Sequence, residues 1–196
     1  TTGNHAQVLQ AVAAAILLGV LVVAWLRLVR PLRVPMELAE LVLLVERRFN
    51  ILGDRVPGAS FLDRFAGAGG VGIEALSRGA ERVVFVDGDR GSLDVVKYNI
   101  AQAGFAERAE AVLAKAEPFL KKRSGPYDIV FLDPPYSMEM LPLLQLVAGS
   151  GLLKADAIVI AEHFRKQPSP GTAGTLTLDR EARYGDTVLA FYRESQ

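Results

Sequence analysis

Residues 61–72 read FLDRFAGAGGVG, and this stretch decides the fold. An apolar strand enters a loop in which Gly67, Gly69 and Gly72 have the G-x-G-x-x-G spacing, and residues 73–78 continue as a helix. Glycine lets the backbone take a positive φ and lets a ligand approach closely, while a helix start offers free N–H groups. The pattern predicts a binding site for a nucleoside-containing cofactor at the end of this strand.

A second apolar strand over residues 82–87 ends at Asp87, about twenty residues further on. A carboxylate in that place can accept both hydroxyls of a ribose, which would suit NAD as well as other nucleoside cofactors. Asp63, just before the glycine loop, can reach the amino group of a bound amino acid. This favours S-adenosylmethionine.

The other informative motif is Asp133-Pro134-Pro135-Tyr136, which directly follows the apolar run 127–132. The two prolines stop the strand from pairing further, so an acidic acceptor, the carbonyl of Pro134 and the ring of Tyr136 gather at one strand end. An exocyclic amino group donates two N–H bonds in the plane of a stackable ring, and this set suits it. We interpret the glycine loop and this turn as methyl-donor and methyl-acceptor sites facing each other across the carboxyl ends of a parallel sheet. An ordinary turn with an exposed tyrosine is the alternative.

Residues 61–193 resemble the bacterial small-subunit ribosomal RNA guanine-N2 methyltransferases (RsmD-like). The segments that carry the resemblance are 61–80, 131–136, 161–163 and 183–193. It implies a Rossmann-like class I methyltransferase fold, S-adenosylmethionine as the cofactor, and ribosomal RNA or the small ribosomal subunit as the partner. We assign catalysis to Asp133, Pro134, Pro135 and Tyr136, and cofactor binding to Asp63, Phe65, Gly67, Gly69, Gly72, Asp87 and Glu117.

Three departures from the family pattern stand out. Arg64 occupies a usually apolar position, and Lys115 stands where an aspartate would meet the adenine amino group, although a cation cannot accept that hydrogen bond. Adenine would then be held by backbone groups or by Glu117. The family's basic RNA-binding segment is replaced by the apolar stretch 38–44, so RNA recognition is not carried over there.

The N-terminus has a different character. Residues 6–26 contain no charge and are long enough as a helix to cross a bilayer of about 30 Å, with Trp25 near one end and three arginines following at 27–33. This predicts a transmembrane helix within residues 1–35, with the N-terminus outside and a methyltransferase domain, 36–196, tethered to the inner membrane on the cytoplasmic side. A buried or dimer-forming helix, or a start-site artefact, is the alternative; the protein would then be soluble and cytoplasmic.

Strand and helix alternate through the core, which predicts a parallel sheet with right-handed crossovers. Predicted strands are 59–63, 82–87, 110–113, 127–132 and 156–161; predicted helices are 71–78, 90–103, 115–122 and 138–148. The segments 175–178 and 187–192 predict an antiparallel hairpin at the end of the chain. The expected fold is therefore α/β, with a seven-stranded, mostly parallel sheet and an antiparallel C-terminal hairpin. A further apolar helix is expected over 36–49.

Composition narrows the chemistry. The chain has no cysteine, which excludes a disulfide, a thiolate metal site and a cysteine nucleophile, and we expect no metal. Its formal charge is zero, so no field of the whole protein attracts RNA. His163 could act as a base, although a histidine at a strand end is more often structural or a substrate contact. The sequence does not indicate an oligomeric state.

Two other classes of function stay open. Adenine N6 in DNA, or a glutamine amide in a protein, would use a similar acceptor turn. A non-catalytic, membrane-tethered nucleoside-binding protein is suggested by Lys115 and by the missing basic segment.

Overall fold

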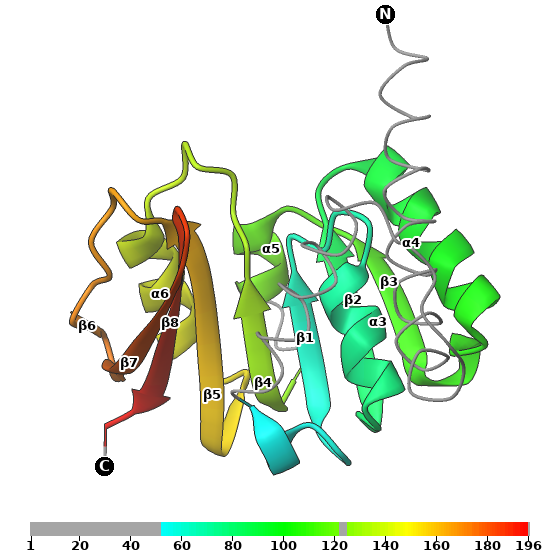
Figure 1. Cartoon of the computed structure of the whole chain (residues 1–196), viewed down its shortest axis with the longest axis horizontal. Coiled ribbons are helices and arrows are strands. Elements are labelled where there is room, and N and C mark those ends of the chain that lie inside the picture. The colour runs from blue at the N-terminus through cyan, green and yellow to red at the C-terminus, as the bar shows by residue number, and fades with distance from the viewer. Residues whose placement is uncertain (1–51, 122–124, 196) are drawn as a thin grey trace, which may run out of the picture.

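The computed structural model describes residues 52–121 and 125–195 (Figure 1). The strands are β1 (Ser60–Arg64), β2 (Arg82–Asp87), β3 (Ala109–Leu113), β4 (Tyr127–Leu132), β5 (Leu153–Phe164), β6 (Thr172–Ala173), β7 (Leu176–Tyr184) and β8 (Thr187–Glu194). The α-helices are α3 (Gly70–Ser77), α4 (Arg90–Ala103), α5 (Ala116–Lys121) and α6 (Met140–Ala148), and the 3-10 helices are η1 (Gly53–Arg55) and η2 (Ala106–Arg108).

The strands of residues 52–121 and 125–195 form one sheet in the order β3-β2-β1-β4-β5-β8-β7-β6. The first five are parallel, and β8, β7 and β6 are antiparallel to their neighbours. The predicted α/β sheet with its C-terminal hairpin is confirmed, but the predicted number of seven strands is wrong, because the sheet has eight. The additional strand, β6, pairs only Thr172 with Thr177 and Ala173 with Leu176 across a turn at Gly174, whose φ is 63°. Two residues are too few to show an alternating pattern in the sequence.

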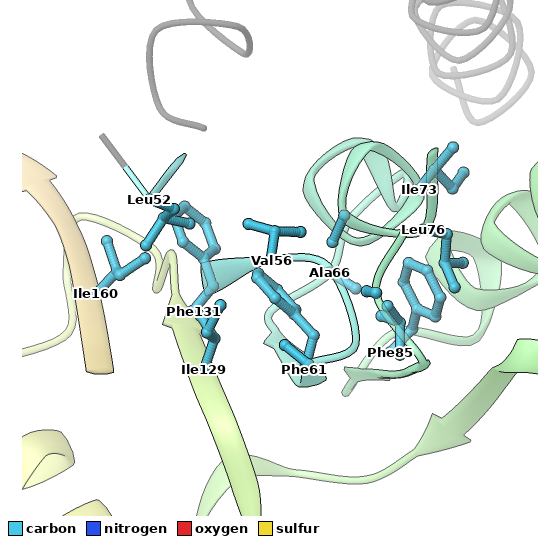
Figure 2. Close-up of a cluster of buried hydrophobic side chains, with 14 of the residues drawn as sticks. Leu52, Val56, Phe61, Ala66, Ile73, Leu76, Phe85, Ile129, Phe131 and Ile160 are labelled. Carbon is cyan, nitrogen blue, oxygen red and sulfur yellow. The ribbon is translucent and has the colours of Figure 1, made fainter. Parts of the chain in front are cut away.

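The strand side chains alternate between two apolar layers, one on each face of the sheet. Phe61 belongs to the layer that contains residues of α3 and α4, while Leu62 belongs to the layer beneath α5 and α6. Figure 2 shows part of the first layer, where Phe61, Phe85 and Phe131 from three strands lie on the same side of the sheet. Burial of such side chains stabilises the fold by about 1.5–3 kcal/mol each. Because helices cover both faces, the central strands carry apolar side chains toward both layers, as Phe61 and Leu62 do in β1.

Most predicted boundaries lie within two residues of those in the structure. The larger differences are at both ends of β5 and at the end of β7, which continues to Tyr184 instead of residue 178. Strands β2 and β4 and helix α4 have the predicted bounds. Strand β5 begins three residues before the predicted 156–161 and ends three residues after it. Its start was missed because Asp156 takes a φ of 64° and the register with β4 shifts between Tyr127 and Ile129. This irregularity breaks the periodic pattern on which the prediction depends.

The N-terminal predictions cannot be compared with the structure. The predicted membrane span 6–26, the helix expected over 36–49 and the boundary at residue 35 lie outside the described residues. Within residues 52–121 and 125–195, none of the helices combines the length and apolarity that crossing a bilayer requires.

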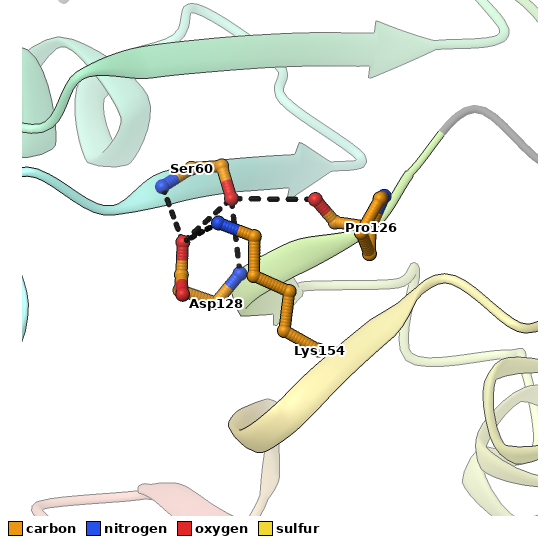
Figure 3. A network of polar contacts seen from close by, with 4 residues as sticks. All are labelled: Ser60, Pro126, Asp128 and Lys154. Carbon is orange, nitrogen blue, oxygen red and sulfur yellow. Dashed lines mark hydrogen bonds and ion pairs between the residues drawn. The ribbon is translucent and has the colours of Figure 1, made fainter.

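A polar network ties the amino ends of three strands together (Figure 3). The Oδ2 atom of Asp128 accepts hydrogen bonds from the Ser60 hydroxyl at 2.6 Å, the Ser60 N–H at 2.8 Å and Lys154 Nζ at 2.7 Å. Burial acts to raise the pKa of Asp128, but the bonds from Lys154 and Ser60 outweigh it, so the pKa lies below its ordinary value of 3.8. The charged carboxylate thus holds β1, β4 and β5 together at the edge opposite to the glycine loop.

We predict that Asp128→Asn lowers the free energy of unfolding at neutral pH by about 1 kcal/mol, because Lys154 loses its charged partner at a partly exposed site. A carboxylate with a depressed pKa stabilises the fold above its unfolded pKa and loses that contribution as the pH falls. The difference between wild type and variant should therefore shrink below pH 3.8. Urea unfolding at several pH values measures this. The control is Asp94→Asn at an exposed position of α4; an equal effect there would contradict the assignment.

Gly72 lets helix α3 pack closely on strand β2. A Cβ atom on Gly72 would lie 2.2 Å from Phe85 Cε1 and 2.9 Å from Val83 Cγ1. Both neighbours belong to the buried layer under the helix, so they have no free space to move into.

We therefore predict that Gly72→Ala lowers the free energy of unfolding by about 2 kcal/mol or more through overpacking. Gly149→Ala is the matched control, since its Cβ would meet only Gln145 O at 3.5 Å and its φ of −84° suits alanine. Thermal melts of both variants test the idea. Similar melting temperatures for the two would show that α3 is not held as tightly as the structure indicates.

Candidate active site

The glycine loop and the acceptor turn follow two neighbouring parallel strands. Arg64 at the end of β1 pairs with Leu132 at the end of β4, and the N–H of Asp133 donates to Arg64 O at 3.4 Å. The strand order reverses between β1 and β4, because β2 and β3 lie on one side and β5 lies on the other. Ligands of open α/β sheets bind at such a switch point, outside the carboxyl ends of the strands. The two predicted sites therefore share one edge of the sheet (Figure 1).

The loop after β1 departs from extended backbone at once. Phe65 has a φ of 70°, and its N–H and that of Ala66 both donate to Val86 O, at 2.9 and 3.2 Å. Gly67 and Gly69 have φ values of 54° and 80°, which favour glycine, and Gly69 is the N-cap residue of α3. The backbone thus bends away from the strand and presents the start of α3 toward the carboxyl edge.

Asp63 stabilises this loop by a hydrogen bond to the start of α3. Its side chain is 2 % exposed, and its Oδ2 accepts the N–H of Gly72 at 2.9 Å. A carboxylate can accept several hydrogen bonds. Gly72, predicted as a cofactor contact, has in addition the packing role against Phe85 described above.

Asp87 joins the end of β2 to the glycine loop. Its Oδ2 accepts the N–H of Gly67 at 2.9 Å and its Oδ1 accepts the N–H of Asp89 at 2.9 Å, while the residue stays partly exposed. Both oxygens retain further lone pairs. The carboxylate predicted to bind a ribose is therefore oriented by backbone groups beside the glycine loop.

Arg64 is the least expected component of the site. It is 1 % exposed, its Nη1 donates to Val86 O at 3.1 Å, and its guanidinium carbon lies 4.2 Å from the centroid of the Phe65 ring. Burial lowers the pKa of Arg64 to about 10, and the charge of Asp87 acts in the opposite direction. The side chain is therefore still a cation at neutral pH. Its buried Nε has no hydrogen-bond partner within the described part of the chain.

The acceptor turn presents the predicted groups at the surface. Asp133, Pro135 and Tyr136 are exposed, whereas Pro134 is buried. The N–H of Met138 donates to Pro135 O at 2.8 Å, which closes the turn. The Tyr136 ring is 69 % exposed. Its edge meets the ring of Phe164, with centroids 5.9 Å apart and planes at 60°. One face of Tyr136 can therefore receive a flat ligand.

Two supporting residues escaped the sequence analysis. Asn99 is 4 % exposed on the apolar face of α4, and its Nδ2 donates to Ala68 O in the glycine loop at 3.0 Å. The sequence does contain a signal for Asn99, because a polar residue on the apolar face of a helix indicates a buried hydrogen bond. The Nε2 of Gln167 donates to Tyr136 O at 3.1 Å across 31 residues, and no local pattern indicates such a contact.

His163 is buried, and both of its ring nitrogens contact protein groups. Its Nε2 lies 2.8 Å from Ser169 Oγ and its Nδ1 lies 3.1 Å from Phe164 O. The Ser169 hydroxyl donates to Glu181 Oε1 at 2.5 Å. The hydrogen bond from Ser169, followed by that from Arg183, lowers the pKa of Glu181. These contacts favour the structural interpretation of His163 over the catalytic one.

The residues predicted to lie near the adenine are at the start of α5. Lys115 is exposed and directly precedes α5, although the predicted helix 115–122 included it. The side chain of Glu117, proposed as an alternative contact, lies outside the described residues. Over 52–121 and 125–195, no cluster of three or more His, Cys, Asp or Glu residues could hold a metal ion.

Comparisons with known proteins agree with this geometry. "Putative rRNA methyltransferase YlbH" of Bacillus subtilis is 39% identical over 76% of this chain and 83% of its own length. "Ribosomal RNA small subunit methyltransferase D" of Escherichia coli is 33% identical over 77% of each chain. A solved structure of a conserved hypothetical protein from Streptococcus pyogenes superposes with a TM-score of 0.71, at 31% identity, over 76% of this chain and 94% of that one.

A family model with the description "Conserved hypothetical protein 95" matches residues 44–193. The predicted cofactor, S-adenosylmethionine, agrees with the methyltransferases among these comparisons. The predicted family is confirmed: the chain belongs to the RsmD-like methyltransferase family.

Proposed function

We propose that this protein transfers a methyl group from S-adenosylmethionine to an exocyclic amino group, the N2 of a guanine in small-subunit ribosomal RNA. The observation that carries the proposal is the pairing of β1 with β4, which puts the glycine loop and Asp133-Pro134-Pro135-Tyr136 side by side at the switch point. The relatives from Bacillus subtilis and Escherichia coli are named as ribosomal RNA methyltransferases, which supports ribosomal RNA as the substrate class.

Positioning accounts for most of the proposed catalysis. The Asp133 carboxylate and the Pro134 carbonyl accept the two N–H bonds of the amine, which turns the nitrogen lone pair out of the base plane. Tyr136 stacks on the base, and its contact with Phe164 fixes the orientation of its ring. Holding the reacting atoms near 3–3.5 Å converts a bimolecular step into an effectively unimolecular one.

Charge moves during the transfer. The cofactor supplies the methyl group as a sulfonium, so a nitrogen–carbon bond forms, the sulfur–carbon bond breaks, and its electron pair stays on sulfur. The positive charge then lies on the amine, next to Asp133. That carboxylate stabilises the developing ammonium and accepts its proton, or passes it to water.

We expect Asp133→Ala to lower kcat for methylation by about 100-fold or more while leaving the Kd for S-adenosylmethionine unchanged. Asp133→Asn keeps a hydrogen-bond acceptor but removes the charge. A kcat between those of the wild type and Asp133→Ala would show that positioning of the amine and stabilisation of its charge both contribute. Radiolabelled methyl transfer to undermodified small-subunit RNA measures the rate, and calorimetry measures cofactor binding. Asp94→Ala, at an exposed position of α4, is the control.

The same assay, run with different substrates, distinguishes RNA methylation from DNA methylation, protein methylation and cofactor binding without transfer. Naked RNA, the assembled small subunit, DNA and protein are offered to the wild type in parallel. Methylation of DNA or protein instead of RNA would replace the acceptor proposed here. Cofactor binding without transfer to any of them would indicate a non-catalytic nucleoside-binding protein. Equal losses of transfer and cofactor binding in Asp133→Ala would refute the role of Asp133.

The membrane anchor remains a separate prediction, based on the uncharged stretch 6–26. We expect the full-length chain to sediment with membranes and to resist extraction by alkaline carbonate. Recovery of the full-length protein in the soluble fraction, without detergent, would disprove the anchor without affecting the proposed reaction.

A further inference from the structure

The loop after β5 contacts the acceptor turn through a hydrogen bond and a ring contact. Strands β4 and β5 are parallel neighbours, with Leu132 opposite Ala161, so the segments that follow them leave the sheet at the same edge. Gln167 Nε2 donates to Tyr136 O at 3.1 Å, and the Phe164 ring meets the Tyr136 ring. Residues 164–167 therefore continue the surface on which the target base is proposed to lie.

The segment is held in a defined conformation. The N–H of Gln167 donates to Phe164 O at 2.9 Å, and the N–H of Arg165 donates to Asp186 O at 2.8 Å. Just beyond it, Ser169 is held by His163 and Glu181. A surface that is ordered before binding loses little conformational entropy when a ligand arrives.

Two cations directly follow an aromatic residue on this segment. Lys166 Nζ lies 5.7 Å from the centroid of the Phe164 ring, and Lys166 is exposed. Arg165 is exposed as well, and its ion pair with Asp186, at 3.5 Å between side chains that are 60% and 72% exposed, contributes little. The guanidinium can therefore turn to a phosphate at small cost. Cations next to aromatic platforms are typical of surfaces that bind single-stranded nucleic acid.

The neighbouring charges give the surface a direction. The exposed carboxylates Asp133 and Glu139 lie on the β4 side. On the β5 side the exposed Asp186 is paired with Arg165, and Lys166 adds a further positive charge. Because the whole chain has no net charge, any attraction for phosphates must be local. A phosphodiester chain leaving the target nucleotide is therefore favoured toward the β5 loop and disfavoured toward α6.

We propose that Phe164, Arg165 and Lys166 form a docking surface for the single-stranded RNA that flanks the target base. Lys166 and Arg165 each bind a phosphate of this flank, and Phe164 supports the neighbouring base beside Tyr136. The proposal rests on the proposed function, since it extends the acceptor site from one base to its flank. The family's basic N-terminal segment is replaced in this chain. The docking surface would supply an RNA contact from the methyltransferase domain instead.

The binding test uses the full-length protein and a fluorescent single-stranded RNA of about ten nucleotides with one central guanine, within the site sizes of single-strand binders. Loss of one phosphate contact removes about 0.7 from the slope of log K against log salt concentration. Lys166→Gln should therefore weaken binding about fivefold near 0.1 M salt and lower the slope by about 0.7. Phe164→Leu, which keeps an apolar side chain, should weaken binding about fivefold or more without changing the slope.

Two exposed residues of α4 provide matched controls. Lys97→Gln makes the same charge change as Lys166→Gln, and Tyr98, 63% exposed, gives the Tyr98→Leu control for the loss of an aromatic ring. Both controls should bind the RNA like the wild type. In methylation assays, Lys166→Gln should raise KM for RNA and leave kcat unchanged.

The outcomes separate this inference from the proposed function. If the wild type methylates RNA but Lys166→Gln and Phe164→Leu bind it as well as their controls do, the docking surface is refuted and the reaction stands. If both variants lose affinity only for the assembled subunit and not for the naked strand, the surface contacts a protein and the inference is also wrong. Absence of RNA methylation by the wild type overturns the proposed function, whatever the binding results.

Discussion

The parallel pairing of β1 with β4 is the constraint on which the site depends. These strands follow each other in the sheet but are more than sixty residues apart in the chain, and their register is exact enough that the N–H of Asp133 still reaches Arg64 O after β4 has ended. A shift of β4 by one residue against β1 would turn Ile129 away from the layer that contains Phe61, so the apolar packing on both faces holds the register. The same packing that stabilises the sheet therefore sets the separation of the two loops. At the other edge, Asp128 ties β1, β4 and β5 together with hydrogen bonds and an ion pair.

Hydrogen bonds with buried or partly buried side chains hold the glycine loop in one bent shape. Asp63 accepts from Gly72, Asp87 accepts from Gly67, and Asn99 donates to Ala68. They offset the strain at Phe65, whose left-handed φ costs about 1–3 kcal/mol in a residue other than glycine. A loop that is already bent needs little rearrangement when a nucleoside binds, which conserves binding energy. The acidic residues that the sequence assigned to the ligand thus also hold the loop in place.

The sequence predicted those parts of the fold that have a local pattern. The apolar runs 82–87 and 127–132 and the helix 90–103 were found with their true bounds, because each is regular and ends at a Gly, Pro or Asp. Strand β6 and the irregular start of β5 were missed, because their pairing depends on left-handed residues and not on periodicity. In the site, Asp87 and the acceptor turn follow strand ends and could be placed. The contacts of Asn99 and Gln167 bridge distant segments, so only the folded chain brings them to the loops.

The departures from the family pattern lie outside the acceptor turn. Arg64 ends β1, directly before the glycine loop, and Lys115 directly precedes α5. Arg64 puts a buried cation under the Phe65 ring, and its charge is partly balanced by Asp87. A cation near the cofactor site opposes a positively charged donor more than the neutral product that remains after transfer. Asp87 therefore has two roles in the structure: it accepts the N–H of Gly67 in the glycine loop, and its charge partly balances that of Arg64.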